Sequence, residues 1–243
     1  MMDKLNLNQH ISKQFNADLE ELKTDLLEMG GLVEQQTVDA VAAIINADSQ
    51  LAEKVITHEE DVDRMEMDMD EKCIRVLARR QPAASDLRMV MMVTKITRDL
   101  ERMGDEAHKV AVMSIQLAEN GKAPLGYVEL RHIGKIVHKM VIKAMDAFAH
   151  FDVELALDVA RKDKKVDQEY KSAMRELATY MMEDPRSISR CMNIIWALRS
   201  LERIGDHARN IAEHVVFLVK GMDVRHIEVK EMEKRIRADH DDD

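Results

Sequence analysis

The chain has 243 residues, with 46 acidic and 36 basic side chains and a formal net charge of −10. This charge, together with the lack of a basic run, argues against a nucleic-acid-binding protein, which needs positive patches that displace counterions from phosphates. Aromatic residues are only 3% of the chain, with 8 Gly and 3 Pro, whereas Met contributes 19. Proteins built from β-strands use many aromatic, β-branched and turn-forming residues, so the composition favours long helices.

The sequence gives no sign of a membrane span or a secretion signal. It has no run of about 18 apolar residues, and residues 1–9 are polar and contain no apolar signal core. The two cysteines, Cys73 and Cys191, are far apart in sequence and do not suggest a disulfide framework. We therefore expect a protein of a reducing, cytoplasmic compartment.

Apolar residues recur at helical spacing through most of the chain. Ile194, Ala197, Leu201 and Ile204, for example, are three or four residues apart and form one face of a helix. Asp48 and Asp152 are typical helix N-caps, because their side chains accept hydrogen bonds from free backbone N–H groups. The predicted helices cover residues 8–47, 50–79, 85–119, 126–150, 153–182 and 187–220.

The second three helices repeat the first three. Residues 29–63 align without a gap with residues 133–167, and about ten of these 35 pairs are identical. In the third helices, the segment that begins at Leu100 aligns with the segment that begins at Leu201. Short connections make neighbouring helices antiparallel. The sequence therefore predicts an all-α protein of two tandem, homologous three-helix bundles, with domains at 1–121 and 122–220 and a charged, disordered tail at 221–243.

Each repeat carries two acid-x-x-x-Asp pairs, one on its second helix and one on its third. Residues four apart lie one turn above each other on a helix, and these pairs follow directly after the apolar stripe. On two antiparallel helices such positions flank the same edge of the contact. We therefore expect four carboxylates to converge in each repeat. The predicted sets are Glu59, Asp63, Glu101 and Asp105 in the first repeat, and Asp163, Asp167, Glu202 and Asp206 in the second.

Four converging carboxylates repel one another and favour binding of a hard, oxygen-ligated divalent cation or iron. His108 follows Asp105 by three residues and offers a nitrogen ligand, but its counterpart in the second repeat is Arg209. An alternative is a solvated acidic face neutralised by nearby arginines, where each exposed ion pair contributes about 0–1 kcal/mol. Those arginines are Arg98, Arg102, Arg199 and Arg203.

The glycines inside the third helices form a further duplicated feature. Gly104 and Gly205 each cost about 1 kcal/mol relative to Ala within a helix. Their duplication predicts a close approach of helices or room for a ligand. No phosphate-binding Gly-rich loop, Ser or Cys triad, or nucleotide-binding motif occurs in the sequence.

Residues 100–105 (LERMGD) and 201–206 (LERIGD), in two copies of a three-helix unit, resemble the PhoU family of bacterial phosphate-transport regulators. The resemblance covers nearly the whole chain. It extends to residues 5–11 (LNLNQHI), 80–88 (RQPAASDLR), 163–170 (DKKVDQEY) and 180–184 (YMMED). The acid-x-x-x-Asp pattern alone is a weak signal, but two copies of Leu-Glu-Arg-x-Gly-Asp in this frame are a specific one.

The resemblance implies a protein that keeps the phosphate-starvation (Pho) response off and restrains phosphate uptake. It implies cytoplasmic homodimers, peripheral to the membrane, that link the ATPase subunit of the phosphate ABC transporter to a sensor histidine kinase. It implies no catalytic activity. Some members of the family carry multinuclear iron or zinc clusters on (E/D)xxxD motifs, whose positions correspond here to the eight carboxylates named above.

Two other classes of protein remain open from the residues alone. A metal-dependent helical-bundle enzyme, with redox or hydrolytic activity, would need a buried site that contains histidine, and the histidines are not duplicated. A dimeric scaffold without a role in phosphate signalling is excluded only by the family resemblance.

Overall fold

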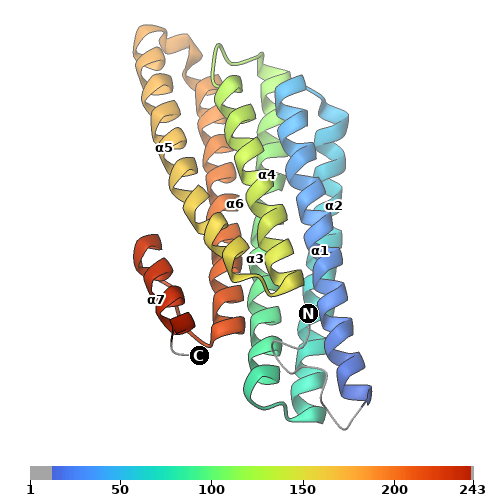
Figure 1. The fold of residues 1–243 in the computed structure, drawn as a ribbon. Helices are drawn as coiled ribbons and strands as arrows, with labels where there is room; N and C mark the ends of the chain where they lie inside the picture. Colours follow the sequence, from blue (N-terminus) through green and yellow to red (C-terminus); the bar gives the residue numbers. More distant parts are fainter. Residues whose placement is uncertain (1–12, 242–243) are drawn as a thin grey trace.

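The computed structural model describes residues 13–241, and the side chains of residues 14–238, as a long bundle of α-helices (Figure 1). The start predicted at residue 8 and the family-like segment 5–11 lie outside the described residues. The helices are α1 (Lys13–Asn46), α2 (Ser49–Arg80), α3 (Ala84–Asn120), α4 (Tyr127–His150), α5 (Val153–Glu183), α6 (Ile188–Lys220) and α7 (Val229–Asp241), with a short 3₁₀ turn η2 (Pro185–Ser187) before α6. The all-α prediction is confirmed.

The predicted helix starts have a clear local cause. The side chain of Asp48 accepts a hydrogen bond from the Leu51 backbone N–H, and that of Asp152 accepts from Glu154 and Leu155. Both aspartates therefore cap the second helix of their repeat, as the sequence predicts, and satisfy N–H groups that have no partner inside the helix.

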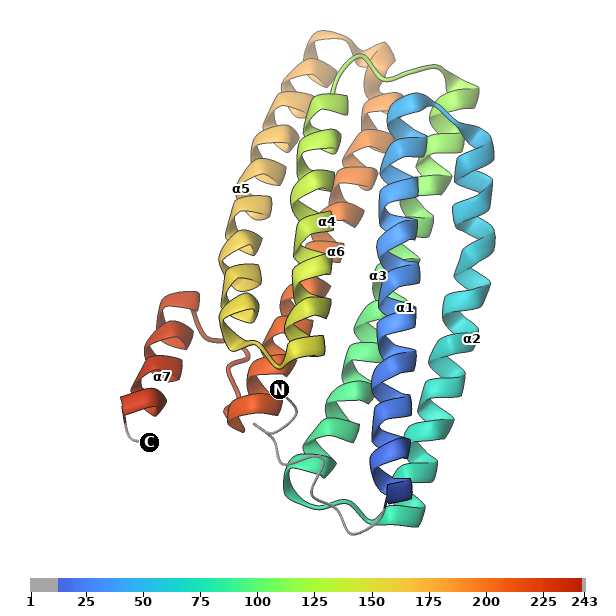
Figure 2. The same cartoon turned by 45° about the vertical axis from the view of Figure 1, so that its right-hand side comes forward.

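The two repeats pack as a first unit (α1–α3) and a second unit (α4–α6), side by side and antiparallel (Figure 2). Contacts between the units run along α3 against α6 and along α1 against α4. The buried apolar side chains of both units form one continuous core. The duplication has therefore produced a body whose halves share their interior.

Glycines allow a close approach of helices at the contact between α1 and α4. A Cβ atom added at Gly134 would lie 2.9 Å from Val41 Cγ1, and one added at Gly30 would lie 2.6 Å from the Met145 terminal methyl. At Gly104 and Gly205, the nearest atoms would be 3.4 Å and 3.7 Å away, which is ordinary contact. The close approach predicted for Gly104 and Gly205 is therefore not found at those positions, and Gly30 and Gly134 provide one instead.

The prediction of a disordered tail is wrong for residues 229–241. They form α7, which packs against α5 and buries Val229, Met232 and Ile236. Arg161 on α5 also donates a 2.6 Å hydrogen bond to Glu233. These apolar residues are three and four apart, so the segment has a narrow amphipathic face despite its charge.

Candidate metal centre

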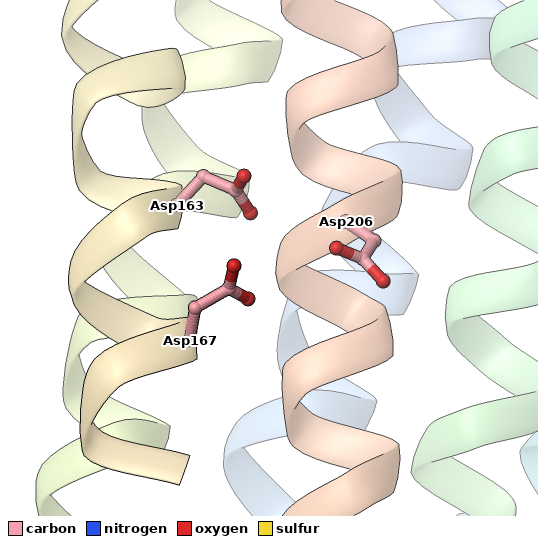
Figure 3. Close-up of side chains that lie close together, drawn as sticks. All are labelled: Asp163, Asp167 and Asp206. Atoms are coloured by element: carbon pink, nitrogen blue, oxygen red, sulfur yellow. The ribbon is translucent and has the colours of Figure 1, made fainter. Parts of the chain in front are cut away.

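Three aspartates of the second unit converge between α5 and α6. Asp163 and Asp167 lie one turn apart on α5 and point toward Asp206 on α6 (Figure 3). Each offers one carboxylate oxygen, and these oxygens lie within 4.8 Å of one another. Asp163 is only 3% exposed, whereas Asp167 and Asp206 are partly exposed. The sequence pattern predicted that these residues share a groove.

The spacing of the three aspartates fits a single cation. Hard divalent ions hold oxygen ligands at about 2.0–2.6 Å, so two ligands on opposite sides of one ion are at most about 5 Å apart. A donor set of carboxylate oxygens without nitrogen or sulfur is typical of Mg²⁺, Mn²⁺ or Ca²⁺ sites. The three side chains therefore match both the size and the chemistry of such an ion.

Glu202, the fourth predicted residue, lies on α6 one turn before Asp206 and is 8% exposed. Burial raises its pKa to about 7, and the neighbouring Asp206, Asp167 and Asp163 add to this effect. Arg199 partly offsets the effect, since its Nη1 lies 2.7 Å from both carboxylate oxygens of Glu202. Burial also raises the pKa values of Asp163 and Asp206. Negative charge is therefore costly in this second-unit cluster (Asp163, Asp167, Glu202 and Asp206).

Arg209 supplies positive charge to the second-unit cluster from within the chain. Its Nη1 donates a 3.0 Å hydrogen bond to Asp163, and its Nε donates a 3.0 Å bond to Glu213. Sequence reasoning aligned Arg209 with His108 but did not predict this pairing.

The four predicted residues of the first unit are close but do not meet at one point. Burial raises the pKa values of Glu59 and Glu101, and both glutamates also feel the charges of Asp63 and Asp105. Within the described part of the first unit, however, no three Asp, Glu, His or Cys ligand atoms lie within 4.8 Å of one another. We call Glu59, Asp63, Glu101 and Asp105 the first-unit cluster.

Internal partners occupy much of the first-unit cluster. His108 Nδ1 contacts Glu59, so the predicted nitrogen ligand lies beside the predicted oxygen ligand. Arg102 forms ion pairs with Glu101 at 3.2 Å and with Asp105 at 3.1 Å. Arg102 and Arg199 thus each supply one positive charge to their cluster, as the alternative interpretation predicted for these arginines. Arg203 instead pairs with Glu106 at 2.9 Å.

Sequence reasoning missed Glu66, which adds to the acidic surface of the first unit. Burial raises its pKa, and Asp70 and Asp63 raise it further. It follows Asp63 by three residues and therefore lies on the same face of α2. This spacing could have identified Glu66 from the sequence. The comparison of repeats hid it, because its counterpart is Tyr170, whose ring lies 5.9 Å from the Arg199 guanidinium carbon.

Comparison with known proteins gives a consistent result. The PhoU domain family matches the chain twice, over residues 26–113 and 130–215. The phosphate-specific transport system accessory protein PhoU homolog of Pseudomonas aeruginosa is 61% identical over 236 residues, which cover 97% of this chain and 98% of that protein. The accessory protein PhoU of Escherichia coli is 45% identical over 241 residues, covering 99% of this chain and 100% of that protein.

Solved structures agree with this result. The crystal structure of PhoU from Pseudomonas aeruginosa superposes with a TM-score of 0.85 and 63% identity, covering 86% of this chain and 100% of that one. The phosphate transport system regulatory protein PhoU from Streptococcus pneumoniae superposes with a TM-score of 0.80 and 31% identity, covering 86% of this chain and 99% of that one.

Proposed function

The chain belongs to the PhoU family, and from this membership we propose that it represses the phosphate-starvation response and restrains phosphate uptake. The observation that carries the proposal is 61% identity to a phosphate-specific transport accessory protein along nearly the whole of both chains. In this proposal the chain is an adaptor between the ATPase subunit of the phosphate transporter and a sensor histidine kinase. Transporter conformation would bias the kinase through coupled binding affinities.

The family assigns the chain to regulatory accessory proteins of phosphate transport and not to enzymes. This assignment removes the alternative of a helical-bundle enzyme with redox or hydrolytic activity. None of the described helices is long and apolar enough to span a membrane. We place the protein in the cytoplasm, held at the membrane through its partners.

Exposed apolar side chains supply candidate contacts for the adaptor. Trp196 on α6 is 55% exposed, and exposed tryptophans are frequent anchors of protein interfaces. Met67 and Ile74 lie two turns apart on α2 and are also exposed. We propose that Trp196 contacts a partner protein and that the α2 pair contributes to a homodimer interface. Trp196→Ala should weaken binding to the ATPase subunit or the kinase, whereas Met182→Ala, at another exposed position, should not.

The acidic clusters bind cations in this proposal. Asp163, Asp167 and Asp206 hold one divalent ion, with Glu202 beside them. The first-unit cluster (Glu59, Asp63, Glu101 and Asp105) holds a second, weaker one, for which iron or zinc are further candidates because His108 lies beside it. Such an ion would fix α5 against α6 and α2 against α3, and so stabilise the surfaces that partners contact.

The function is tested by alkaline phosphatase activity in phosphate-rich medium after deletion of this gene from its bacterial host. Deletion should raise the activity, and the intact gene should restore the low value. Complementation with Asp163→Asn/Asp206→Asn tests the role of the second-unit cluster, with Lys54→Ala/Lys171→Ala, two exposed positions elsewhere, as a control.

Low phosphatase activity in the deletion strain would refute the proposed repression. Full repression by the double Asn variant, with unchanged metal content of the purified protein, would refute a role of the second-unit cluster while leaving the regulatory function intact.

A further inference from the structure

A cleft lined by charged and polar residues lies along the contact between the two units, where α3 meets α6 and the loop that follows α6. Its volume is about 420 Å³. Lys95, Arg98 and Arg102 line it from α3, and Arg225 lines it from the loop. The cleft is distinct from the space between α5 and α6 that holds the second-unit cluster. It is therefore a separate feature of the molecule.

The cleft presents more positive than negative charge, although the whole chain is acidic. Among the described residues, Lys95 and Arg98 form no hydrogen bond and no ion pair within 4 Å. Arg225 pairs with Asp223 at 2.6 Å, while Arg102 is shared with the first-unit cluster. Lys95 and Arg98 are thus two cations near Asp223 and Glu66 but unpaired with either.

The one carboxylate that lines the cleft is already fully engaged. Asp99 is buried on α3 and accepts hydrogen bonds from His207 Nδ1 at 2.8 Å, Asn210 Nδ2 at 3.1 Å and His214 Nε2 at 3.2 Å. Burial alone would favour the neutral acid, but these hydrogen bonds outweigh it and hold the pKa of Asp99 below its ordinary value. The charged Asp99 therefore fixes three side chains of α6 in the wall of the cleft.

The positions on α3 and α6 that correspond by repeat to the cleft residues do not form a second positive cleft. The positive charge of the cleft is therefore not a general result of packing two repeats together. There the counterpart of Lys95 is Trp196, and the counterpart of His207 is Glu106. Glu106 is 3% exposed and pairs with Lys109 and Arg203, each at 2.9 Å. That side is neutralised internally, whereas the cleft side keeps two unpaired cations.

We propose that this cleft binds a small molecule that carries more than one phosphate group. Its volume is in the range of pockets for drug-sized ligands, and guanidinium groups bind phosphate oxygens through paired hydrogen bonds. An adjoining pocket of about 40 Å³ shares Lys95, His214 and Arg225 with the cleft, and its remaining lining residues are Met92, Phe217, Glu213 and Asp223. Lys95, Arg98 and Arg225 bind the phosphates in the cleft.

Calorimetric titration of the full chain with ATP, pyrophosphate and inorganic phosphate, at constant ionic strength, tests the proposal. We expect saturable binding of ATP and pyrophosphate that is tighter than binding of inorganic phosphate. Lys95→Ala/Arg98→Ala should weaken it about tenfold or more. These two side chains have no ion-pair partner to lose, so the variant should fold normally, which thermal unfolding checks. Lys54→Ala/Lys171→Ala removes the same charge elsewhere and should bind as the original protein does.

Three results would overturn this assignment. The first is the absence of saturable binding of ATP and pyrophosphate at millimolar concentration. The second is equal weakening in Lys54→Ala/Lys171→Ala, which would mean that only net charge attracts the anions. The third is binding of a hexaglutamate peptide, abolished by Lys95→Ala/Arg98→Ala, without binding of the phosphates; the cleft would then belong to an acidic protein partner.

Discussion

The two acidic clusters arise from the same sequence pattern but differ in how far their carboxylates converge. In the second unit, oxygens of Asp163, Asp167 and Asp206 lie within 4.8 Å of one another. In the first unit, His108 contacts the Glu59 carboxylate, and Arg102 forms ion pairs with both Glu101 and Asp105. The duplicated spacing determines which face carries the acids. The residue one turn beyond, His108 or Arg209, determines which internal partner each cluster receives.

The largest difference should appear in metal affinity. Asp206→Asn replaces one of three convergent carboxylates by a neutral amide and should lower the affinity for Mn²⁺ by about tenfold or more, because even residues that only orient metal ligands contribute about 10–100-fold. Asp105→Asn, its counterpart in the first unit, should leave the tighter site unchanged. Calorimetry on chelator-treated protein measures both. An equal loss in the two variants would mean that the clusters are equivalent.

Removal of the basic side chain that contacts each cluster, Arg209 in the second unit and His108 in the first, should lower stability by different amounts. Arg209→Ala leaves Asp163 and Glu213 buried without their partner, and we expect the free energy of unfolding to fall by about 2–4 kcal/mol. His108→Ala should cost less than about 1 kcal/mol, because Glu59 is more exposed. Urea unfolding without metal provides the comparison. Added Mn²⁺ should restore part of the stability of Arg209→Ala. Equal losses of unfolding free energy in Arg209→Ala and His108→Ala would contradict the expected difference between the two units.

The pKa of Glu202 predicts how stability depends on pH in the metal-free protein. The folded state holds the proton up to about pH 7, whereas an unfolded chain releases it near its ordinary pKa of about 4.3. Stability should therefore fall by about 1–3 kcal/mol as pH rises between these values and then stay level.

Glu202→Gln should reduce this fall and be more stable than the original protein at pH 8. Glu101→Gln in the first unit should give a smaller gain, because Glu101 is less buried. Urea unfolding at pH 5 and pH 8 measures the effect. A Glu202→Gln protein that loses the same stability over this pH range would show that another group titrates.

The last comparison concerns the glycines between α1 and α4. Gly134→Ala meets the stiff side chain of Val41 and should cost about 1–3 kcal/mol. Gly30→Ala meets only the flexible end of Met145 and should cost less than about 1 kcal/mol. Gly31→Ala has no atom within 4 Å and should stabilise the helix by up to about 1 kcal/mol. Thermal unfolding ranks the three, and destabilisation by Gly31→Ala would contradict the packing argument.

The helices and the duplicated acid pattern could be predicted because their causes are local. Periodic apolar residues and the caps at Asp48 and Asp152 act within a few turns of the chain. The convergence of Asp163, Asp167 and Asp206 in one unit alone depends on the distance between helices and on side-chain rotamers. The sequence could place Arg209 one turn beyond Asp206 but could not show that it binds Asp163. The helix at 229–241 was predictable in principle, and its high charge obscured its apolar face.

Comparison of the two repeats could not have predicted the contacts of some buried polar residues. Asp99 aligns with Ser200 and Glu106 aligns with His207, so neither pair shows a shared pattern in the sequence. Their roles come from the antiparallel contact of α3 with α6, where each residue meets side chains of the other unit. At these two pairs, the divergence between the copies falls where the two units meet.

The shared core has a consequence for experiments that divide the protein. A fragment that ends after α3 would expose the apolar residues of α1 and α3 that normally contact α4 and α6. Such a fragment would associate with itself or with chaperones, and its capture of a partner would report this adhesive surface instead of a native interface. Partner surfaces on this protein are therefore better located by point substitutions in the intact chain than by deletion of either half.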